Sequence, residues 1–257
     1  MAGSRGSGSI WPRSCAASSD GADAGAPARR RFVYGRRRGR PLRATQRSAA
    51  DALLPERAIE LPESGLVDPR NLFPRRPEKV WLEIGFGGGE HLCAQATQYP
   101  DIGLIGCEVF ENGIAKLLAE VARLGLGNVR IFAEDARVLL DRLPPAAIGR
   151  VFVLFPDPWP KRRHHKRRIV SRATLDRLAD IMQDGAELRL ATDDRDYLRA
   201  MLESVLDHAA FAWTARGPRD WRERPPDWPP TRYETKARAA GRAPAFLTFL
   251  RRPRATA

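Results

Sequence analysis

The chain has 257 residues, of which 43% are hydrophobic and 29% charged, enough for one α/β domain with additions or at most two small domains. No apolar run approaches the roughly 18 to 20 residues that cross a bilayer, which excludes a membrane-spanning protein. Three cysteines have neither metal-ligand spacing nor the density of a disulfide framework, so a zinc site and a disulfide-stapled secreted module are excluded as well. The unusual property is the charge, a formal +13.

Positive charge is concentrated in three segments. Residues 29–43 carry eight arginines and no acidic residue, residues 161–168 carry six basic residues and no acidic one, and residues 216–254 carry a net +7. Such segments indicate an extended polyanion as partner, because each neutralised phosphate releases counterions. Charge alone leaves a solvated, arginine-rich surface open as the alternative.

The N-terminal part of the chain differs from the rest. Residues 1–28 are rich in Gly, Ala and Ser without periodicity and are expected to be a disordered tail. They contain no apolar h-region and no amphipathic stripe, so neither a secretory signal nor a transit peptide is expected, and the expected compartment is the cytoplasm. Residues 29–60 are expected to form a basic N-terminal extension, and residues 61–257 a single domain.

From about residue 79 short apolar runs alternate with helical patterns. Strands are expected over residues 80–84, 102–109, 129–133, 151–155, 187–191, 211–215 and 245–251. Helices are expected over residues 88–98, 114–124, a short stretch from 136, 175–182 and 197–208. Strands that alternate with helices predict an α/β fold, with a doubly wound, mostly parallel seven-stranded sheet and helices on both faces.

Acidic residues and glycines gather where the first three strands end. The first strand ends in Glu83 and a loop with Gly85 and Gly87, where the backbone can turn tightly and approach a ligand that a Cβ would exclude. The second and third strands end in Glu108 and Asp135, whose carboxylates can accept hydrogen bonds from ribose hydroxyls and from an adenine amino group. Ligands of such sheets bind beyond the carboxyl ends of the strands, so these groups predict a nucleoside site.

Two classes of cofactor compete for this site. A dinucleotide fingerprint has a third glycine where this chain has Glu90, and a carboxylate is a poor neighbour for a pyrophosphate. S-adenosylmethionine carries a sulfonium, an ammonium group and no phosphate. A pocket lined by acids, with Glu83 pointing toward it, suits that molecule, so we expect the methyl donor.

The fourth strand leads into residues 156–161, PDPWPK, here called the reactive loop. Three prolines stiffen it. Asp157 can accept hydrogen bonds from the N1 and N2 edge of a guanine, and Trp159 either stacks on a base or packs within the loop. The basic run at residues 161–168 follows directly, which favours nucleic acid as the substrate.

These motifs resemble those of the bacterial tRNA (guanine-N7-)-methyltransferase family, over about residues 31–252. The likeness is carried by LEIGFG at 82–87, EDA at 134–136, FPDPW at 155–159 with Lys161, KRR at 166–168, ATD at 191–193 and TRYE at 231–234. The resemblance implies a Rossmann-like class I methyltransferase fold, S-adenosylmethionine as donor, and the guanine at position 46 of the tRNA variable loop as acceptor.

The resemblance also implies a role for each matching residue. The implied catalytic residue is Asp157. The donor-binding residues, including the two glycines of the loop, are Glu83, Gly85, Gly87, Glu108, Asp135 and Asp157. The substrate-binding residues are Lys161, Asp193, Thr231, Arg232, Tyr233 and Glu234. The RNA-contacting residues are Arg163, His164, His165, Lys166, Arg167 and Arg168.

The expected reaction needs no general base, because guanine N7 carries a lone pair and no proton. Asp157 would then orient the base in a one-step displacement at the sulfonium methyl. tRNA is the expected partner, with no metal, no membrane and no obligate protein partner. Two alternatives stay open: an RNA-binding or dinucleotide-binding Rossmann-like protein without methyl transfer, and a guanine methyltransferase that acts on another RNA.

Overall fold

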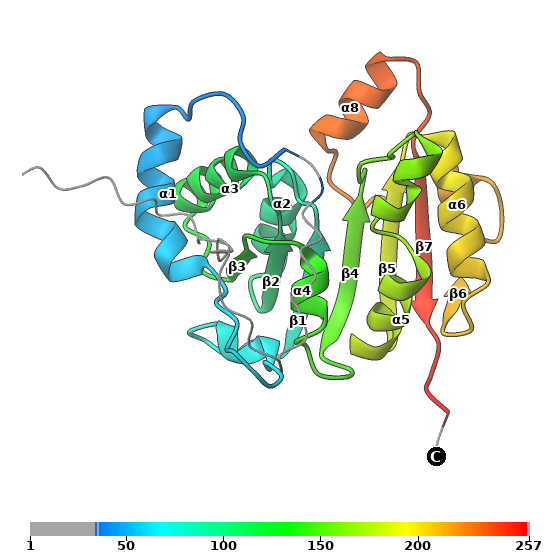
Figure 1. Cartoon of the computed structure of the whole chain (residues 1–257), viewed down its shortest axis with the longest axis horizontal. Helices are drawn as coiled ribbons and strands as arrows, with labels where there is room; N and C mark the ends of the chain where they lie inside the picture. Colours follow the sequence, from blue (N-terminus) through cyan, green and yellow to red (C-terminus); the bar gives the residue numbers. More distant parts are fainter. Residues whose placement is uncertain (1–33, 35, 256–257) are drawn as a thin grey trace, which may run out of the picture.

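A seven-stranded sheet forms the centre of the computed structural model, which describes residue 34 and residues 36–255 (Figure 1). The tail expected at residues 1–28 lies outside the described residues. The strands are β1 (Lys79–Ile84), β2 (Ile102–Cys107), β3 (Val129–Phe132), β4 (Ile148–Leu154), β5 (Met182–Thr192), β6 (Phe211–Trp213) and β7 (Ala245–Arg251). Their order is β3-β2-β1-β4-β5-β7-β6, with β1 to β5 parallel and β7 antiparallel to both neighbours. The predicted mostly parallel sheet is confirmed.

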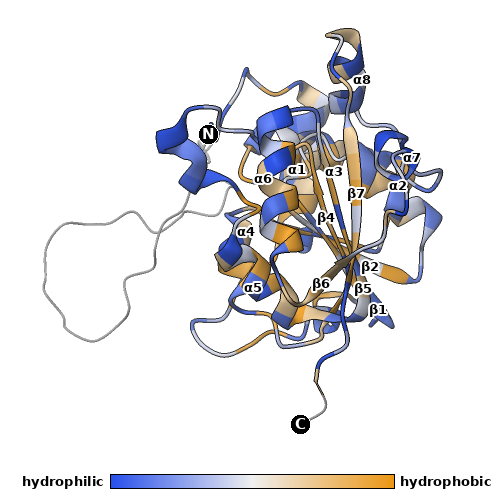
Figure 2. Cartoon of the chain, turned by 90° about the vertical axis from the view of Figure 1, so that its right-hand side faces the viewer, coloured by the Kyte–Doolittle hydropathy of each residue, from blue (hydrophilic) through white to orange (hydrophobic). Residues whose placement is uncertain are grey.

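Helices cover both faces of this sheet. The α-helices of five or more residues are α1 (Ala44–Arg57), α2 (Glu90–Gln98), α3 (Glu111–Leu124), α4 (Ala136–Leu140), α5 (Arg172–Ile181), α6 (Arg195–Leu206) and α8 (Arg232–Ala239). Short turns of helix are η1 (Pro69–Leu72), η2 (Arg162–Arg167) and α7 (Arg219–Arg222). Buried side chains of α1, α2 and α3 form one apolar cluster with the sheet, and those of α4, α5 and α6 form the other. Figure 2 shows the apolar strands enclosed between these layers.

The sequence of β1 explains why both faces are covered. Side chains alternate along a strand, and β1 is buried at every position after Lys79. Val80 and Leu82 belong to the cluster with α4 to α6, and Trp81 belongs to the cluster with α1 to α3. Each large apolar side chain stabilises the fold by about 1.5–3 kcal/mol when it is fully buried, so such a strand requires helices on both sides.

Helix α1 arises from the segment that we expected to be a basic extension. Its Ala50 and Leu54 are buried in the same cluster as residues of α3. The start of the domain at residue 61 stays a prediction, but the core recruits side chains from before that residue. No helix in the described part of the chain is long and apolar enough to cross a membrane.

The carboxyl ends of the parallel strands form one edge of the sheet. β1 pairs with β2 on one side and with β4 on the other, so the chain direction of the crossovers reverses at β1. Ligands of doubly wound sheets bind at such a reversal. Figure 1 shows α8 standing beyond the ends of β4 and β5, above this edge.

Candidate functional site

A cleft of about 400 Å³ lies at the carboxyl ends of β1 to β4. This volume falls within the roughly 300–1,000 Å³ that is usual for small-molecule sites. Of the residues that the sequence predicts for the site, the cleft is lined by Gly85, Gly87, Glu108, Asp135, Asp157, Arg167 and Tyr233. Residues from five separate segments of the chain therefore meet at the switch point of the sheet.

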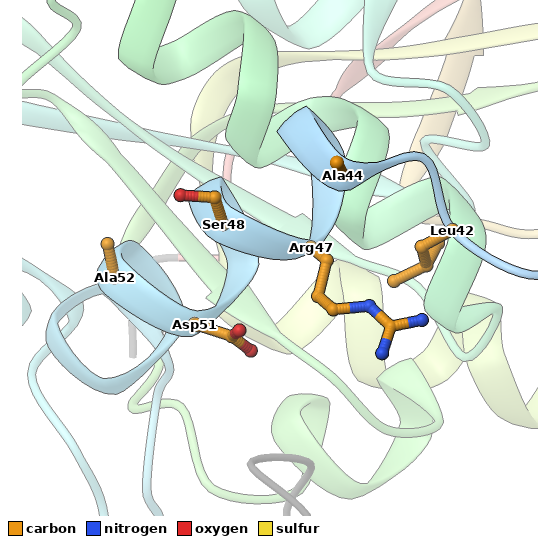
Figure 3. Close-up of a pocket in the computed structure, with 6 residues that line it drawn as sticks. All are labelled: Leu42, Ala44, Arg47, Ser48, Asp51 and Ala52. Carbon is orange, nitrogen blue, oxygen red and sulfur yellow. The ribbon is translucent and has the colours of Figure 1, made fainter.

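A second hollow lies on the surface of α1 and is lined by Leu42, Ala44, Arg47, Ser48, Asp51 and Ala52 (Figure 3). It is shallow, open to solvent and made from one helix and the residues just before it. None of its residues lines the cleft or belongs to the predicted site. We therefore place the functional site in the cleft.

The glycine loop after β1 and helix α3, which packs against it, need glycine for different reasons. Gly85 and Gly87 have φ angles of +76° and +57°, in the left-handed region that favours glycine. A Cβ on Gly85 would have no other atom within 4 Å, so this residue faces open space in the cleft. A Cβ on Gly113 of α3 would lie only 2.2 Å from the carbonyl oxygen of Gly87. Loop and helix thus approach each other more closely than larger residues permit.

Glu108 follows β2, and the backbone around it holds its half-buried carboxylate in place. One oxygen accepts the N–H of Gly87 at 2.8 Å, and the other accepts those of Val109 at 2.8 Å and Phe110 at 3.0 Å. Burial raises the pKa of Glu108, the backbone N–H groups oppose this rise, and the charge of Asp157 adds to it. A carboxylate has about four acceptor positions, so Glu108 keeps about one for a ligand. Contact with both ribose hydroxyls would require a backbone bond to yield.

The other two acids at strand ends already have protein partners. Asp135 begins α4 as its N-cap, accepting the N–H of Arg137 at 2.9 Å and pairing with the Arg137 guanidinium at 2.9 Å. Glu83 is only 3% exposed, and its carboxylate lies 2.7 Å from Nδ1 of His91. Because side chains alternate along β1, Glu83 turns toward α2 and does not line the cleft, contrary to our expectation. Its role in donor binding stays a prediction.

Asp157 projects from the reactive loop between two residues with unusual backbone angles. Phe155 and Trp159 have φ values of +51° and +46°. Non-glycine residues in this region carry roughly 1–3 kcal/mol of strain each and persist where the surrounding structure holds them. Asp157 is exposed in the cleft and forms no hydrogen bond or ion pair with any residue that the structure describes. Its carboxylate is therefore available to a ligand.

The residues of the basic run that are predicted to contact RNA divide into two groups. Arg163 and Lys166 are exposed, whereas His164 and His165 are half-buried. The His164 ring packs edge-on against Trp159, with 5.9 Å between the ring centres. Partial burial and the neighbouring cations, Arg167 first among them, lower the pKa of His164. These four residues all belong to η2.

Arg167 and Arg168 instead turn toward the protein. The guanidinium of Arg167 lies 5.3 Å from the ring centre of Tyr34 and 4.9 Å from that of Trp159. Arg168 is only 5% exposed and donates to the carbonyl oxygen of Pro158 at 2.8 Å. Burial of Arg168 leaves little of its guanidinium exposed for a phosphate, and its contact with RNA stays a prediction.

The residues at the start of α8 that are predicted to bind the substrate have different surroundings. The hydroxyl of Thr231 accepts the N–H of Glu234 at 3.2 Å, and the buried Glu234 pairs with Arg238 at 3.0 Å. Tyr233 is 41% exposed and packs over the glycine loop, with Cε2 only 2.9 Å from where a Cβ on Gly87 would lie. Thr231 and Glu234 thus shape the helix, while Tyr233 faces the cleft.

The remaining predicted residues lie outside the cleft. Lys161 is exposed at the end of the reactive loop. Asp193 pairs with Arg242 at 2.6 Å, and the guanidinium of Arg232 lies 5.6 Å from the ring centre of Tyr233. In the described part of the chain, no group of three or more His, Cys, Asp or Glu side chains is arranged to bind a metal ion.

Sequence reasoning missed Tyr34, which lines the cleft together with Arg36. Its ring packs edge-on against Trp159, with the ring centres 6.4 Å apart. Aromatic residues within an arginine-rich segment, here Phe32 and Tyr34, were the available signal, because solvated basic segments rarely require them.

The sheet order and the acid-lined cleft beside a glycine loop define a class I methyltransferase. A family model described as "Putative methyltransferase" matches residues 77–247. The chain is 56% identical over 227 residues to the tRNA (guanine-N(7)-)-methyltransferase of Rhodospirillum rubrum, covering 86% of this chain and 88% of that protein. It is 50% identical to the protein of that name from Paramagnetospirillum magneticum, covering 89% and 96%. The chain belongs to the tRNA (guanine-N(7)-)-methyltransferase family.

A solved structure shares the fold at much lower sequence similarity. The 16S rRNA methyltransferase KamB superposes with a TM-score of 0.51 at 18% identity, covering 77% of this chain and 99% of that chain. This similarity concerns the fold alone, and the family assignment stands on the closer relatives.

Proposed function

We propose that the protein transfers the methyl group of S-adenosylmethionine to N7 of a guanine in tRNA, at position 46 of the variable loop. The observation that carries the proposal is the placement of two carboxylates in one cleft. The Glu108 carboxylate accepts the N–H of Gly87 in the glycine loop, and Asp157 lines the same cleft and pairs with no residue in the described part of the chain. The names of the close relatives support tRNA and guanine N7 as the substrate.

The groups on the donor side suit S-adenosylmethionine. Glu108 keeps acceptor capacity for a ribose hydroxyl, and Gly85 leaves open space where a side chain would stand. Glu90 occupies the first position of α2 and pairs with Lys116, which places a carboxylate where a dinucleotide would bring its pyrophosphate. The bound donor supplies an electrophilic methyl group on a positively charged sulfur.

On the acceptor side, Asp157 has two tasks. Its oxygens accept hydrogen bonds from the N1 and N2 edge of the guanine, which turns N7 toward the methyl group. Its negative charge favours the positive charge that passes to the base. Guanine N7 has no proton to lose, so the residues of this cleft act by positioning and electrostatics rather than by proton transfer.

The exposed basic residues are placed to bind the tRNA backbone. Arg163 and Lys166 lie on η2, directly after the reactive loop. Phosphate contacts there would fix the register of the RNA while the cleft receives the base. The base must leave its stack to enter a cleft of this kind, at a cost of a few kcal/mol.

Mass spectrometry of nucleosides tests the proposal directly. Unmodified tRNA incubated with the protein and S-adenosylmethionine should yield 7-methylguanosine, and tRNA that carries adenosine at position 46 should yield none. The matched control is a tRNA that keeps the guanine at position 46 and carries a replacement at another position of the same loop. No product from the unmodified tRNA would overturn the proposal, and product from the position-46 variant would redirect it to another guanine.

One further candidate is a Rossmann-like protein that binds RNA or a dinucleotide without methyl transfer. Calorimetric titration with S-adenosylmethionine and with NAD separates the two. We expect binding of the first and none of the second, because of the Glu90 carboxylate at the start of α2.

A further inference from the structure

Arg168 is buried at the base of the reactive loop, where its guanidinium joins two elements. Nε donates to the carbonyl oxygen of Pro158 at 2.8 Å, and Nη2 pairs with the Asp196 carboxylate of α6 at 2.5 Å. The guanidinium carbon lies 4.7 Å from the ring centre of Tyr197. We propose that Arg168 is a positioning residue that fixes the reactive loop on α6, so that Asp157 faces the cleft. This inference rests on the proposed function.

The conformation of the reactive loop explains why it needs such an attachment. Phe155 and Trp159 hold strained φ angles, and Asp157 lies midway between them. Strand β5 fixes the start of the loop, where Phe155 donates its N–H to the carbonyl oxygen of Ala191 at 2.8 Å. Arg168 fixes the loop beyond Asp157, on the carbonyl of the very next residue. Without the second attachment the strained end is free to relax.

The place where Arg168 sits is itself rigid. Its own N–H donates to the carbonyl oxygen of His165 at 3.0 Å, which closes η2. Tyr197 is fully buried, and its hydroxyl accepts the N–H of Val170 at 3.1 Å. Leaving a buried guanidinium without a partner costs free energy. The hydrogen bonds of Arg168 therefore keep its side chain in this position.

The geometry requires arginine rather than any cation. The guanidinium presents two N–H groups in different directions, toward Pro158 and toward Asp196, while its plane packs on Tyr197. A lysine ammonium is a compact point charge that cannot reproduce this fork and plane. Arg168→Lys therefore keeps the charge and loses the attachment.

The basic run thus contains two kinds of residue that different measurements can distinguish. A residue that contacts phosphate contributes to the salt dependence of tRNA affinity. A residue that positions Asp157 contributes to the rate of methyl transfer. Lys166 is exposed and provides the matched control within the same run.

The experiment compares Arg168→Lys and Arg168→Met with Lys166→Met. For the Arg168 variants we expect the rate of single-turnover methylation to fall on the order of 10²-fold. This is the loss that misplacing a positioning group such as Asp157 by about 1 Å causes. The slope of log affinity for tRNA against log salt should stay at the wild-type value, and donor affinity should change less than twofold. Lys166→Met should lower that slope by about one unit. A lowered slope with an unchanged rate in Arg168→Lys would overturn the inference.

A double-mutant cycle tests whether Arg168 acts through Asp157. In an Asp157→Asn background, removing Arg168 should cost little more, because the carboxylate that it positions is already gone. Rate losses that multiply fully would contradict the inference. If Arg168→Met does not fold, Asp196→Ala removes one end of the attachment from a side chain that is 59% exposed, and the same pattern should appear at smaller size.

Failure of the proposed function gives a different result. In that case the wild-type protein itself makes no 7-methylguanosine. Hydrogen exchange then still tests the attachment, because the amides of His164, Arg168 and Val170 are hydrogen-bonded around the loop base. We expect faster exchange over residues 164–170 in Asp196→Ala, and unchanged exchange there would overturn the role of Arg168.

Discussion

The two sides of the cleft are held in place by different means. On the donor side backbone groups fix the site. Three N–H groups hold the carboxylate of Glu108, and the glycine loop has backbone angles that favour glycine. On the acceptor side arginine side chains make the attachments: Arg168 donates to the reactive loop, and Arg242, which follows α8, pairs with Asp193. We therefore expect many side-chain substitutions to leave donor affinity unchanged, and substitutions of these arginines to disturb the positioning of the acceptor base.

The largest expected effect lies on the acceptor side. Asp157→Asn keeps the shape of the side chain but places an amide donor against donors of the guanine. We expect single-turnover methylation to fall on the order of 10²-fold or more, as for lost electrostatic stabilisation, while donor affinity changes much less. The wild-type rate of the methyl-transfer step should show no rising limb near neutral pH from a general base. Near-wild-type rates in this variant would make Asp157 a loop-shaping residue only.

On the donor side the largest effect should come from Glu108. Glu108→Ala removes a charged acceptor, and we expect donor affinity to weaken by about 1.5–3 kcal/mol, the usual range for hydrogen bonds to charged groups. The variant also leaves the N–H groups of Gly87, Val109 and Phe110 without their acceptor, so its thermal stability must be measured alongside. Unchanged affinity in a titration with S-adenosylmethionine would remove Glu108 from the donor site.

The basic run gives a smaller effect that is confined to RNA binding. Replacing both Arg163 and Lys166 with methionine should flatten the log–log salt slope of tRNA affinity by up to roughly two units. Donor affinity should stay at the wild-type value, because both side chains lie outside the cleft. An unchanged slope would identify this part of η2 as a solvated surface.

The pH dependence of donor binding should be the mildest effect. Burial raises the pKa of Glu108 above its ordinary 4.5, so its carboxylate takes up a proton earlier as the pH falls. Only the ionised form combines full acceptor capacity with negative charge, so donor affinity should fall as the pH is lowered toward the raised pKa of Glu108. Glu108→Gln should lose this dependence, and a dependence that persists in the variant would belong to another group.

Much of the fold follows from hydrophobic periodicity, since all seven expected strands exist. Several strand ends differ by a few residues, and the largest difference is in β5, which begins at Met182 rather than residue 187. Residues 183–185, Gln-Asp-Gly, have the composition of a turn, but Met182 pairs with Ile148 of β4 and extends the strand across them. Long-range pairing of this kind is not visible in a local pattern.

The two longest of the helices that sequence reasoning missed, α1 and α8, were missed for a related reason. Helix α1 contains Pro55 and buries only Ala50 and Leu54, and α8 buries only Glu234 and Ala237. Neither helix has the broad apolar stripe on which a periodicity argument depends. Both helices are stabilised by their tertiary contacts with the rest of the protein rather than by a broad apolar face of their own.

The candidate site shows the same limit at the level of single residues. Arg167 and Arg168 are adjacent and chemically identical, yet one packs against two aromatic rings and the other is buried against Pro158 and Asp196. The sequence marks the run as basic but contains no sign of which member meets a carboxylate of α6. Similarly, Glu83 and Ile84 are neighbours on β1, and only the alternation of the strand decides which of them lines the cleft.

The position of β7 has a consequence for incomplete chains. This strand is the last of the seven along the chain but lies inside the sheet, pairing with β5 from Ala245 to Leu250 and with β6 on its other side. A chain interrupted before Ala245 leaves one edge of β5 bare over six residues and leaves β6 without a partner. Bare edges are templates for pairing between molecules. A truncated product should therefore aggregate or be degraded rather than persist as a competitor that binds tRNA without modifying it.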